Sequence, residues 1–498
     1  MTRTPGKLIP DDFPAVPGVD DLEAITVSPG TGGADAVGFV VSATGDAPAG
    51  LGLGRDALEH AGFDGGAGET LVVPRAAGAE LVAVGVADPA DAAALRDAAA
   101  AFVRAASRHA RVALVVPGGD LDPAVAVQAI VEGAALARYR YTPLKHNGRH
   151  VPLVTLGIAL PGADDAVVAA GARAAVVAAR AAIVARDLAN TPPAHLTAPD
   201  LADIAVRLGH RFGFGVEVFD KEAVIALGCG GLLGVNRGSA NEPRMIKLSY
   251  EPAGAASGHL GLVGKGIMYD SGGINLKPSD PIHLLMKLDM GGAGAVLGAF
   301  CALRDRGVSA RVTGWLSCTD NMPSSRAYVM GDVLTTHGGT TIEVKNTDAE
   351  GRLVMSDAFD LAVEEGVDGI VSIATLTGAA LMALGTARAP MFANDPDMAR
   401  LVLEAADTVD EPAWRFPLER KYRPQLESRI ADISNLGGPY AGSTTAALFL
   451  EHFAAGTPWA HLDIVGTMQT EKDDSWRPAG ATGYGARLLL EAAARFTA

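Results

Sequence analysis

The sequence predicts an α/β protein with two domains, each built on a mixed, largely parallel sheet, and a long helix joining them. Three observations lead to this prediction. The chain has 498 residues, which is more than one ordinary domain needs. Apolar strand patterns alternate with helical patterns along its length. An alanine- and valine-rich stretch over residues 164–189 is long enough for about seven helical turns and separates the two regions.

The first region contains short apolar runs that predict buried strands over residues 37–44, 80–87 and 111–119. Between the last two, residues 91–110 have the spacing of a helix. We therefore expect an N-terminal α/β domain over residues 1–163. The alanine-rich stretch opens after "PGADD" and closes at "NTPP", so we expect residues 164–189 to form a buried connecting helix.

The second region, residues 190–498, repeats the α/β pattern. Strands are expected over 259–267, 310–318, 341–345, 369–376 and 460–467, and helices over 292–307 and after Arg352. Ligands of open α/β sheets bind beyond the carboxyl ends of the strands. The segments that follow four of these strands are polar or glycine-rich. A functional site is therefore expected at the strand carboxyl ends of this domain.

Composition narrows the class of protein. Charged residues make up 20% of the chain and mean hydropathy is +0.22, which argues against disorder. With 57 acidic and 41 basic residues the net charge is −16, and no basic cluster is evident, so a general nucleic-acid surface is not expected. The N-terminus lacks the apolar core of a signal peptide, and no apolar run approaches a membrane span. We expect a cytoplasmic protein without a membrane partner.

Four acids stand at predicted strand ends. Asp270 and Asp289 follow the strand over 259–267, and Asp348 and Glu350 lie in "NTDAEGRL", residues 346–353. Four carboxylates in one pocket could not all ionise unaided, because like charges raise one another's pKa. Two divalent cations would balance them, and carboxylates that bridge two ions are a recurrent hydrolytic design. Read alone, Asp348 and Glu350 also fit a helix N-terminus.

The sequence lacks several other motifs that mark catalytic or cofactor sites. There is no HExxH zinc motif, and "GGAGAV" after Asp289 is not the GxGxxG of a dinucleotide site. "DSGG" around Ser271 is not the GxSxG of a serine hydrolase. The three cysteines are scattered and form no CxxC pair, so they suggest neither a disulfide framework nor a thiolate metal site.

Two motifs together resemble one family. "VGKGIMYDSGG", which is followed by Lys277, and "NTDAEGRL" are similar to the signatures of the leucyl aminopeptidases, also called cytosol aminopeptidases. Five further segments resemble that family in the same order, namely "NTPPAHLT", "NMPSSRAYVMGDVLTT", "ATLTGA", "ADISNLG" and "WAHLDIVGT". The resemblance covers about residues 187–496, and over the first 160 residues it rests on the order of the elements.

The resemblance implies a fold and a set of site residues. It implies a macro-domain-like domain over 1–163 and a catalytic metallopeptidase domain over 190–498. The implied ligands of one metal ion are Lys265, Asp270, Asp289 and Glu350, and those of the other are Asp270, Asp348 and Glu350. Lys277 would stabilise the oxyanion, and Arg352 would hold a bicarbonate ion that takes a proton. The implied reaction is release of N-terminal amino acids by attack of a metal-bridging hydroxide.

The resemblance also implies a pocket for the first side chain of the substrate. The matching positions are Met286, Thr375, Gly378, Val465 and Met468, and the carbonyl of Leu376 would accept a hydrogen bond from the substrate. Methionine is an adaptable apolar lining, so leucine and methionine are the expected N-terminal residues. Val465 stands where relatives often carry alanine, which predicts a shallower pocket and weaker activity on aromatic N-termini.

The same resemblance implies two divalent metal ions per subunit, Zn²⁺ first, with Mn²⁺ or Mg²⁺ able to replace one of them. It further implies a homohexamer arranged as a dimer of trimers. Two alternatives stay open, a specialised dipeptidase (for Cys-Gly or in biosynthesis) and a DNA-binding or regulatory relative. The segment between Lys277 and Asp289 is one residue longer than in common relatives, which leaves the pocket details less certain than the metal ligands.

Overall fold

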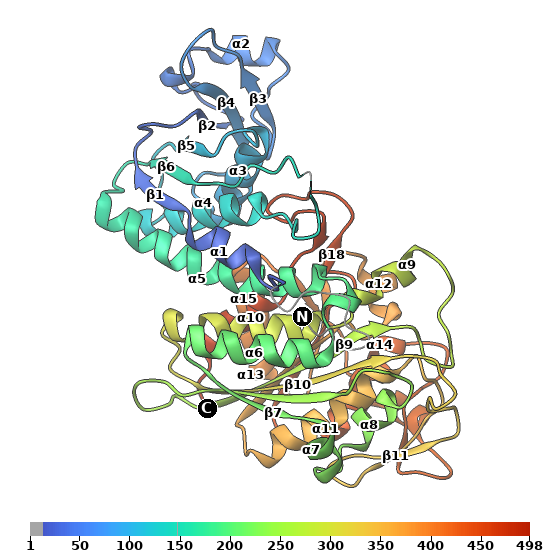
Figure 1. The fold of residues 1–498 in the computed structure, drawn as a ribbon. Coiled ribbons are helices and arrows are strands. Elements are labelled where there is room, and N and C mark those ends of the chain that lie inside the picture. The colour runs from blue at the N-terminus through green and yellow to red at the C-terminus, as the bar shows by residue number, and fades with distance from the viewer. Residues whose placement is uncertain (1–12, 147) are drawn as a thin grey trace. The chain divides into compact units, whose positions relative to one another are not determined.

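The computed structural model describes residues 13–146 and 148–498, and within them the chain forms two compact units. The N-terminal unit consists of Val16–Ile183 together with Thr470–Gly480. The C-terminal unit consists of Val184–Gln469 and Ala481–Ala498, with the described residues that precede Val16. Figure 1 shows the elements of both units.

The N-terminal unit is built on a six-stranded sheet with the order β1-β6-β5-β2-β4-β3. All neighbouring strands are parallel except β3, which runs antiparallel to β4 at the edge. The strands are β1 (Thr26–Pro29), β2 (Ala36–Ser42), β3 (Thr70–Val73), β4 (Glu80–Val86), β5 (Arg111–Val115) and β6 (Thr155–Ala159).

The two central helices of this unit begin at aspartate caps. Asp91 accepts hydrogen bonds from the first backbone amides of α3, and Asp122 does the same for α4. The predicted helix over 164–189 is α5, which continues into the C-terminal unit. The helices are α1 (Pro17–Glu23), η1 (Ala49–Leu51), α2 (Arg55–His60), α3 (Ala92–Ala105), α4 (Pro123–Arg138) and α5 (Asp165–Asn190).

The C-terminal unit is built on an eight-stranded sheet with the order β15-β14-β17-β13-β9-β10-β8-β7. Its four central strands, β17, β13, β9 and β10, are mutually parallel, while β8 pairs antiparallel with both β10 and β7, and β14 with β17. The strands are β7 (Gly215–Phe219), β8 (Arg244–Tyr250), β9 (His259–Asp270), β10 (Arg311–Asn321), β13 (Gly369–Ala374), β14 (Ala389–Ala393), β15 (Ala413–Arg415) and β17 (Trp459–Asp463).

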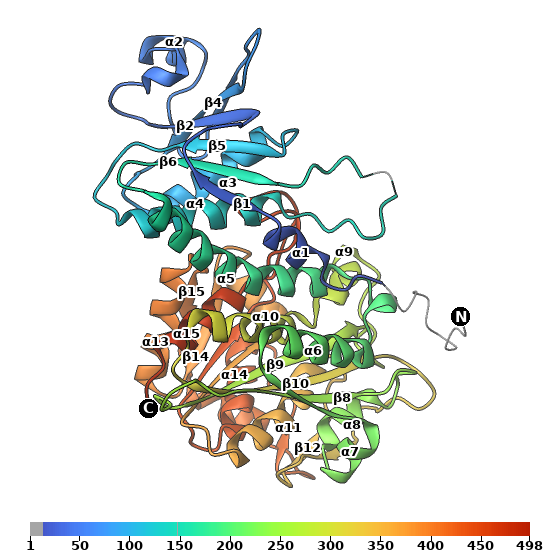
Figure 2. The same cartoon turned by 60° about the vertical axis from the view of Figure 1, so that its left-hand side comes forward.

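Helices cover both faces of this sheet (Figures 1 and 2). One layer contains α6 (Ala198–Phe212), α10 (Gly291–Arg306), α13 (Pro396–Thr408) and α15 (Ala486–Arg495). The other contains α7 (Lys221–Ala226), α8 (Gly230–Asn236), α11 (Glu350–Glu364) and α14 (Gly442–Phe453), and encloses a large apolar core. The remaining helices are η2 (Pro193–His195), α9 (Pro281–Leu284), η3 (Leu285–Leu288), α12 (Gly378–Leu384) and η4 (Arg420–Leu426).

Glycines let α10 approach the sheet closely. A Cβ at Gly264 in β9 would lie 2.9 Å from the backbone of Ala293, and a Cβ at Gly292 would lie 2.2 Å from the carbonyl oxygen of Ile373. Neither backbone contact can yield without moving the helix away from the strands. The "GGAGAV" segment is therefore a packing surface, and it fixes where α10 begins, two residues after Asp289.

The α/β fold class is confirmed, with one difference in strand pairing. The strand expected over 341–345 is β12 (Thr341–Glu343), which belongs to a separate small sheet with β11 (Val333–Thr335) and β16 (Ile433–Ser434). A last two-stranded sheet joins β18 (Gln469–Thr470) and β19 (Gly480–Ala481). Alternation along the chain predicts that a strand forms, but its partner depends on residues some 90 positions away.

Two segments of the described chain are long and apolar enough to cross a membrane by length and composition, namely Asp165–Asn190 and Pro281–Arg306. More than half of each apolar window is buried inside the protein, 56% and 78% respectively. Such burial is typical of core helices in a folded domain.

Candidate metal centre and active site

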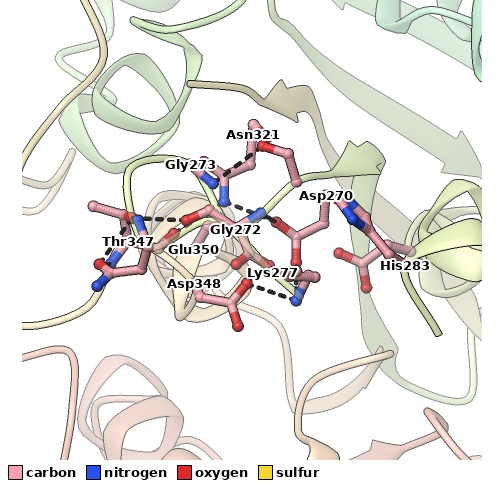
Figure 3. A network of polar contacts seen from close by, with 12 residues as sticks. Asp270, Gly272, Gly273, Lys277, His283, Asn321, Thr347, Asp348 and Glu350 are labelled. Atoms are coloured by element: carbon pink, nitrogen blue, oxygen red, sulfur yellow. Dashed lines mark hydrogen bonds and ion pairs between the residues drawn. The ribbon is translucent and has the colours of Figure 1, made fainter. Parts of the chain in front are cut away.

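Three buried acids meet at the carboxyl end of the central parallel strands. Asp270 is the last residue of β9, Asp289 follows η3, and Glu350 is the first residue of α11. One carboxylate oxygen from each lies within 4.8 Å of the others. The structure thus brings together three of the four acids predicted from strand ends. Asp348, two residues before α11, reaches the same place through Lys277 (Figure 3).

Lys265 lies at the inner side of this cluster. Its Nζ is 2.9 Å from Asp289 Oδ2 and 2.8 Å from Glu350 Oε1, and it donates a hydrogen bond of 2.7 Å to the carbonyl of Thr375. Only 3% of its side chain is exposed. A Cβ at Gly351 would lie 2.7 Å from both Cε and Nζ of Lys265, so the glycine makes room for the lysine.

Lys277 contacts the other pair of acids. Its Nζ is 2.8 Å from Asp270 Oδ2 and 2.6 Å from Asp348 Oδ1. Its side chain is 19% exposed, compared with 3% for Lys265. The two lysines therefore divide the site, with the amine of Lys265 deep inside the cluster and that of Lys277 at its open side.

The electrostatics of the cluster are those of crowded, buried acids. Burial raises the pKa of Asp270 and Asp289, and the charge of Glu350 adds to this effect on both. Burial, together with the charges of Asp270 and Glu350, raises the pKa of Asp348 to about 6. Burial opposes the ionised form of Glu350 too, but Lys265 and Lys277 outweigh it, and its pKa stays below the ordinary value.

Both lysines respond to the acids around them. Burial alone would lower the pKa of Lys265, yet Asp289, Glu350 and Asp270 together raise it above the ordinary value. The same balance raises the pKa of Lys277, which faces Asp270, Glu350 and Asp348. Four acids against two ammonium groups leave the cluster with an excess of negative charge, which is the electrostatic setting for a multivalent cation.

The donor set fits a divalent metal ion. It is rich in carboxylate oxygens, as hard and borderline metals prefer. Among the described residues, Glu350 Oε2 is buried with neither a hydrogen-bond donor nor an ion-pair partner. Asp289 Oδ2 and Asp348 Oδ1 are buried as well, and each has an ion-pair contact to a lysine without hydrogen-bond geometry. Oxygens left in this state have room to coordinate a cation.

A ring of hydrogen bonds that sequence reasoning missed holds the acids in place. Asn321, at the end of β10, pairs with Asp270 in the strand register and donates a bond of 2.8 Å to its Oδ1. The backbone amide of Gly272 donates to the same oxygen at 2.9 Å. Both donors occupy Oδ1, so Oδ2 is the oxygen that faces the cluster. In the sequence Asn321 stands near a predicted strand end and opens the family-like segment "NMPSSRAYVMGDVLTT", but no role was assigned to it.

Thr347 ties the two motifs to each other. Its hydroxyl donates to the carbonyl of Gly272 at 2.7 Å and receives the backbone amide of Asn275 at 2.8 Å. Its own carbonyl accepts from Asn321 and from the hydroxyl of Tyr328, at 2.9 Å and 2.7 Å. These bonds fix the turn that carries Asp348 against the turn that follows Asp270 (Figure 3).

Arg352 is a buried cation beside the acids. It is 5% exposed, and burial lowers its pKa to about 10 even though Glu350 and Asp463 favour its charged form. Its Nε and Nη1 are buried and have no hydrogen-bond acceptor among the described residues. Two unused guanidinium donors suit a small planar anion such as a carboxylate or bicarbonate.

The predicted substrate-side residues lie on neighbouring turns. Because β13 and β17 pair in parallel, the turn with Thr375, Leu376 and Gly378 lies beside the turn with Val465 and Met468. The Thr375 hydroxyl donates to Asp289 Oδ1 at 2.6 Å, which links this turn to the acids. Met286 belongs to η3, three residues before Asp289.

Asp463 fixes the backbone of the first turn. Its Oδ1 receives the amide of Leu376 at 3.0 Å, and its Oδ2 receives the hydroxyl of Thr377 at 2.7 Å. It stands at the end of β17 and is fully buried. Asp463 therefore orients the backbone next to Thr375, whose carbonyl holds Lys265. In the sequence it follows an apolar run and lies in the family-like segment "WAHLDIVGT", but no role was assigned to it.

Comparison with known proteins agrees with this geometry. Residues 183–490 match the "Cytosol aminopeptidase family, catalytic domain", and residues 49–148 match the "Cytosol aminopeptidase family, N-terminal domain". A "Probable cytosol aminopeptidase" of Chlorobium limicola is 40% identical over 463 residues, covering 88% of this chain and 92% of that protein. One of Streptomyces avermitilis is 41% identical over 456 residues, covering 88% of each.

A solved structure is also similar over nearly the whole chain. It is described as "Bottromycin maturation enzyme BotP in complex with Mn", and its TM-score is 0.84 at 37% identity, covering 93% of this chain and 99% of that one. Fold and site together define a metal-dependent hydrolase of peptide bonds. More narrowly, the chain belongs to the cytosol aminopeptidase family. It is a metal-dependent aminopeptidase, and the family is dinuclear.

Proposed function

We propose that the cluster is the dinuclear centre of an aminopeptidase that releases leucine- or methionine-type residues from the N-termini of peptides. In this proposal the metal ligands are Lys265, Asp270, Asp289, Asp348 and Glu350, and the catalytic cations are Lys277 and Arg352. The positions of the acids and lysines within one cluster support it.

One observation carries the assignment of roles, namely the different placement of the two lysines. Lys265 is enclosed by Asp289, Glu350 and the carbonyl of Thr375, with 3% of its side chain exposed. That position suits a metal ligand, which must be neutral and has no need to reach the substrate. Lys277 contacts Asp270 and Asp348 from the open side, which suits a group that meets the substrate.

Two divalent cations would polarise the scissile carbonyl and lower the pKa of a shared water molecule. The chain's own residues do the rest. Lys277 donates a charged hydrogen bond to the oxygen that becomes negative during attack. Arg352 would hold a bicarbonate ion through its two unused donors, and this ion would supply a base for the attacking water. A bound anion is proposed as the base because the acids of the cluster are engaged as metal ligands.

The substrate's first side chain would enter between Met286, Thr375, Gly378, Val465 and Met468, while Leu376 offers its carbonyl to the substrate. Met468 supports this apolar pocket, because its Cε comes within 2.6 Å of where a Cβ on Gly291 would lie. The side chain therefore fills the space that the glycine leaves open. A pocket closed in this way and narrowed by Val465 favours leucine and methionine over phenylalanine and tryptophan.

The remaining parts of the proposal rest on the family. We propose Zn²⁺ as the resting metal, with Mn²⁺ or Mg²⁺ able to replace one ion. Mn is present in the similar bottromycin maturation enzyme. We further propose a homohexamer, a dimer of trimers, in the cytoplasm, as the name of the family suggests.

A second candidate is a biosynthetic role with the same chemistry. The observation that favours it is the similarity to a bottromycin maturation enzyme at 37% identity over 93% of this chain. An enzyme of that kind would act on one modified peptide and leave most simple substrates untouched.

The test is a panel of amino-acid amides and dipeptides, assayed after chelation and after return of Zn²⁺ or Mn²⁺. Wild type should hydrolyse leucine and methionine substrates fastest and aromatic ones more slowly. Lys277→Ala should lower kcat/KM by about 10² to 10³, the usual effect of losing an oxyanion donor. Lys247→Ala is the matched control, because this lysine lies on β8, where it pairs with Glu365, and its loss should leave the rate unchanged.

Full activity in Lys277→Ala would contradict the role assigned to this lysine. No hydrolysis of any simple substrate, with either metal, would contradict a general aminopeptidase and favour the biosynthetic candidate. A preference for phenylalanine or tryptophan over leucine would contradict the pocket assignment.

A further inference from the structure

A cavity of about 550 Å³ in the N-terminal unit is lined by an unusual number of cations. It is lined by residues from the end of α3, the end of α4 and the loop between α4 and β6, together with Asp473. Six basic residues line it, from the two short stretches 104–108 and 138–149, namely Arg104, Arg108, Arg138, Arg140, Lys145 and Arg149.

One acid faces these six cations across the cavity. Asp473 is the only acidic residue among the described lining residues. The whole chain carries a net charge of −16, so a cavity with this excess of positive charge runs against the overall composition. Four of the cations lie within residues 138–149, a stretch without an acidic residue, so the sequence does hold a local basic cluster, and packing places Arg104 and Arg108 beside it.

Part of this charge has a structural explanation. Arg138 is buried and donates to the carbonyls of Val103, Ala106, His109 and Val151, so it holds the walls of the cavity together. Cations are also favoured at helix C-termini, where the helix dipole is negative. Arg138 is therefore a framework residue, and its charge faces carbonyl groups rather than a carboxylate.

Two further arginines share a single carboxylate oxygen. Asp473 Oδ2 lies 2.8 Å from Arg104 Nη1 and 2.6 Å from Arg140 Nη2. The other oxygen of Asp473 accepts the backbone amide of Ala479 at 2.9 Å. One carboxylate therefore balances two guanidinium groups, and one positive charge is left over. A second anion could bind to this excess charge.

The loop adds cations that have no such explanation. Lys145 and Arg149 are exposed, lie beyond the helix ends, and have no acidic partner among the described residues. Arg108 is also exposed, at 70% of its side chain, and pairs with Glu80. Backbone carbonyls and Asp473 therefore account for the inner cations, and Glu80 accounts for Arg108, which leaves Lys145 and Arg149 without an acidic partner among the described residues.

The charges also repel one another. Burial and the charges of Arg138 and Arg140 lower the pKa of His150, another lining residue. Burial and the neighbouring Arg140 lower the pKa of Arg138 to about 10. An anion in the cavity would relieve this repulsion.

We propose that this cavity binds a small anion that carries two or more phosphate groups. Its volume falls in the range of about 300–1,000 Å³ that is typical of sites for small molecules. Guanidinium groups match phosphate oxygens in pairs, and several of them around one cavity suit adjacent phosphates better than a single carboxylate. Lys145 and Arg149 would close over the outer phosphate.

Calorimetric titration of the metal-loaded enzyme with inorganic tripolyphosphate tests the proposal. The double variant Lys145→Ala/Arg149→Ala should bind at least tenfold more weakly than wild type. Arg75→Ala/Arg173→Ala is the matched control, since it removes two exposed arginines of the same unit outside the cavity and should bind as wild type does. Asp473→Asn should bind more tightly, because it removes the internal competitor and keeps an oxygen for Ala479.

Phosphates also coordinate metal ions, so tripolyphosphate is expected to bind at the metal centre too. Binding at the cavity is the part that the Lys145→Ala/Arg149→Ala variant loses. Equal affinity in wild type and that variant would overturn the proposal, and so would an equal loss in the control pair. Tighter binding of a single-stranded oligonucleotide, abolished by the same substitutions, would overturn the small-molecule assignment in favour of a nucleic-acid surface.

Discussion

At the residue scale, the "NTDAEGRL" segment shows how neighbouring residues share different tasks. Asp348 contacts Lys277 and Glu350 contacts Lys265, while the N-cap of α11 is Ala349, with no side-chain capping hydrogen bond. The helix-cap interpretation of Asp348 therefore fails. Thr347, for which the sequence suggested no role, makes hydrogen bonds to both sides of the site.

Gly351 makes a residue-scale prediction. Its backbone is helical, so alanine suits its conformation, but the added Cβ would lie 2.7 Å from Lys265 Cε and Nζ. Lys265 would have to leave its place between Asp289 and Glu350. We expect Gly351→Ala to lower kcat/KM at least tenfold and to weaken metal binding, measured by competition with a chromogenic chelator.

Gly54→Ala is the control for this substitution, because a Cβ there meets nothing within 4 Å. It should leave activity and metal affinity unchanged. Wild-type metal affinity in Gly351→Ala would show that Lys265 adapts without cost, and would weaken its assignment as a ligand.

Motifs and strand ends were enough to predict which acids and lysines gather at the site. Asp270, Asp289 and Glu350 come within 4.8 Å of each other, as the strand-end rule anticipates. Asn321 and Asp463 were not predicted, because each acts through a hydrogen bond to a partner at least 51 positions away. A single sequence shows the residue type at such positions but not the partner.

At the scale of elements, close contacts between helices and strands decide where the site forms. The central strands have continuous apolar sequences, which is typical of strands that are buried on both faces. These strands were predicted from the sequence. The edge strands β7 and β15 were not predicted, since partly exposed strands of three to five residues leave little periodicity. The buried strand β14 was not predicted either, because an apolar run of five residues does not distinguish a strand from a helix. The strand β12 was predicted but its small sheet was not, because its partner β16 lies some 90 positions away.

An acid on α11 links that helix to α8. Asp357 is fully buried and receives the backbone amides of Leu232 and His337, at 2.8 Å and 2.9 Å. It therefore caps the start of α8 from another element, where α8 has no side-chain cap of its own. Burial, against these two hydrogen bonds, raises the pKa of Asp357 to about 7.

This raised pKa predicts a pH effect on stability. Between pH about 4 and 7 the folded state holds a proton on Asp357 that the unfolded state has lost, so stability falls as pH rises through this window and then levels off. Asp357→Asn removes that dependence. Relative to the variant, wild type should lose about 2–3 kcal/mol between pH 5 and 8.

Thermal unfolding of both proteins at several pH values measures this difference. Asp407→Asn, which changes an exposed acid on α13, should run parallel to wild type. Parallel profiles for Asp357→Asn and wild type would contradict the prediction, because they would mean that Asp357 titrates alike in the folded and unfolded chain.

At the scale of the whole molecule, charge is distributed unevenly between the two units. The acid cluster lies wholly within the C-terminal unit, and the cationic cavity lies wholly within the N-terminal unit. Neither the acid cluster nor the cationic cavity can be inferred from the net charge of −16. Composition therefore describes the average surface correctly and says nothing about where opposite charges gather.

The acid cluster predicts how the whole chain responds to metal. Four acids and two lysines leave it short of positive charge without a cation, so binding of two dications stabilises the folded state over the unfolded one. At a free metal concentration 100 times the dissociation constant, this gain is about 2.7 kcal/mol per site. Chelation should lower Tm by several degrees, and Zn²⁺ or Mn²⁺ should restore it.

Glu350→Gln should abolish this metal-dependent shift, since the residue contacts Lys265 at the centre of the cluster and offers a buried, unpartnered oxygen. Glu404→Gln, a surface acid of the same unit, should keep the wild-type shift. An equal shift in both variants would place the stabilising metal elsewhere. Differential scanning fluorimetry with and without chelator separates these outcomes, and it does so independently of any substrate.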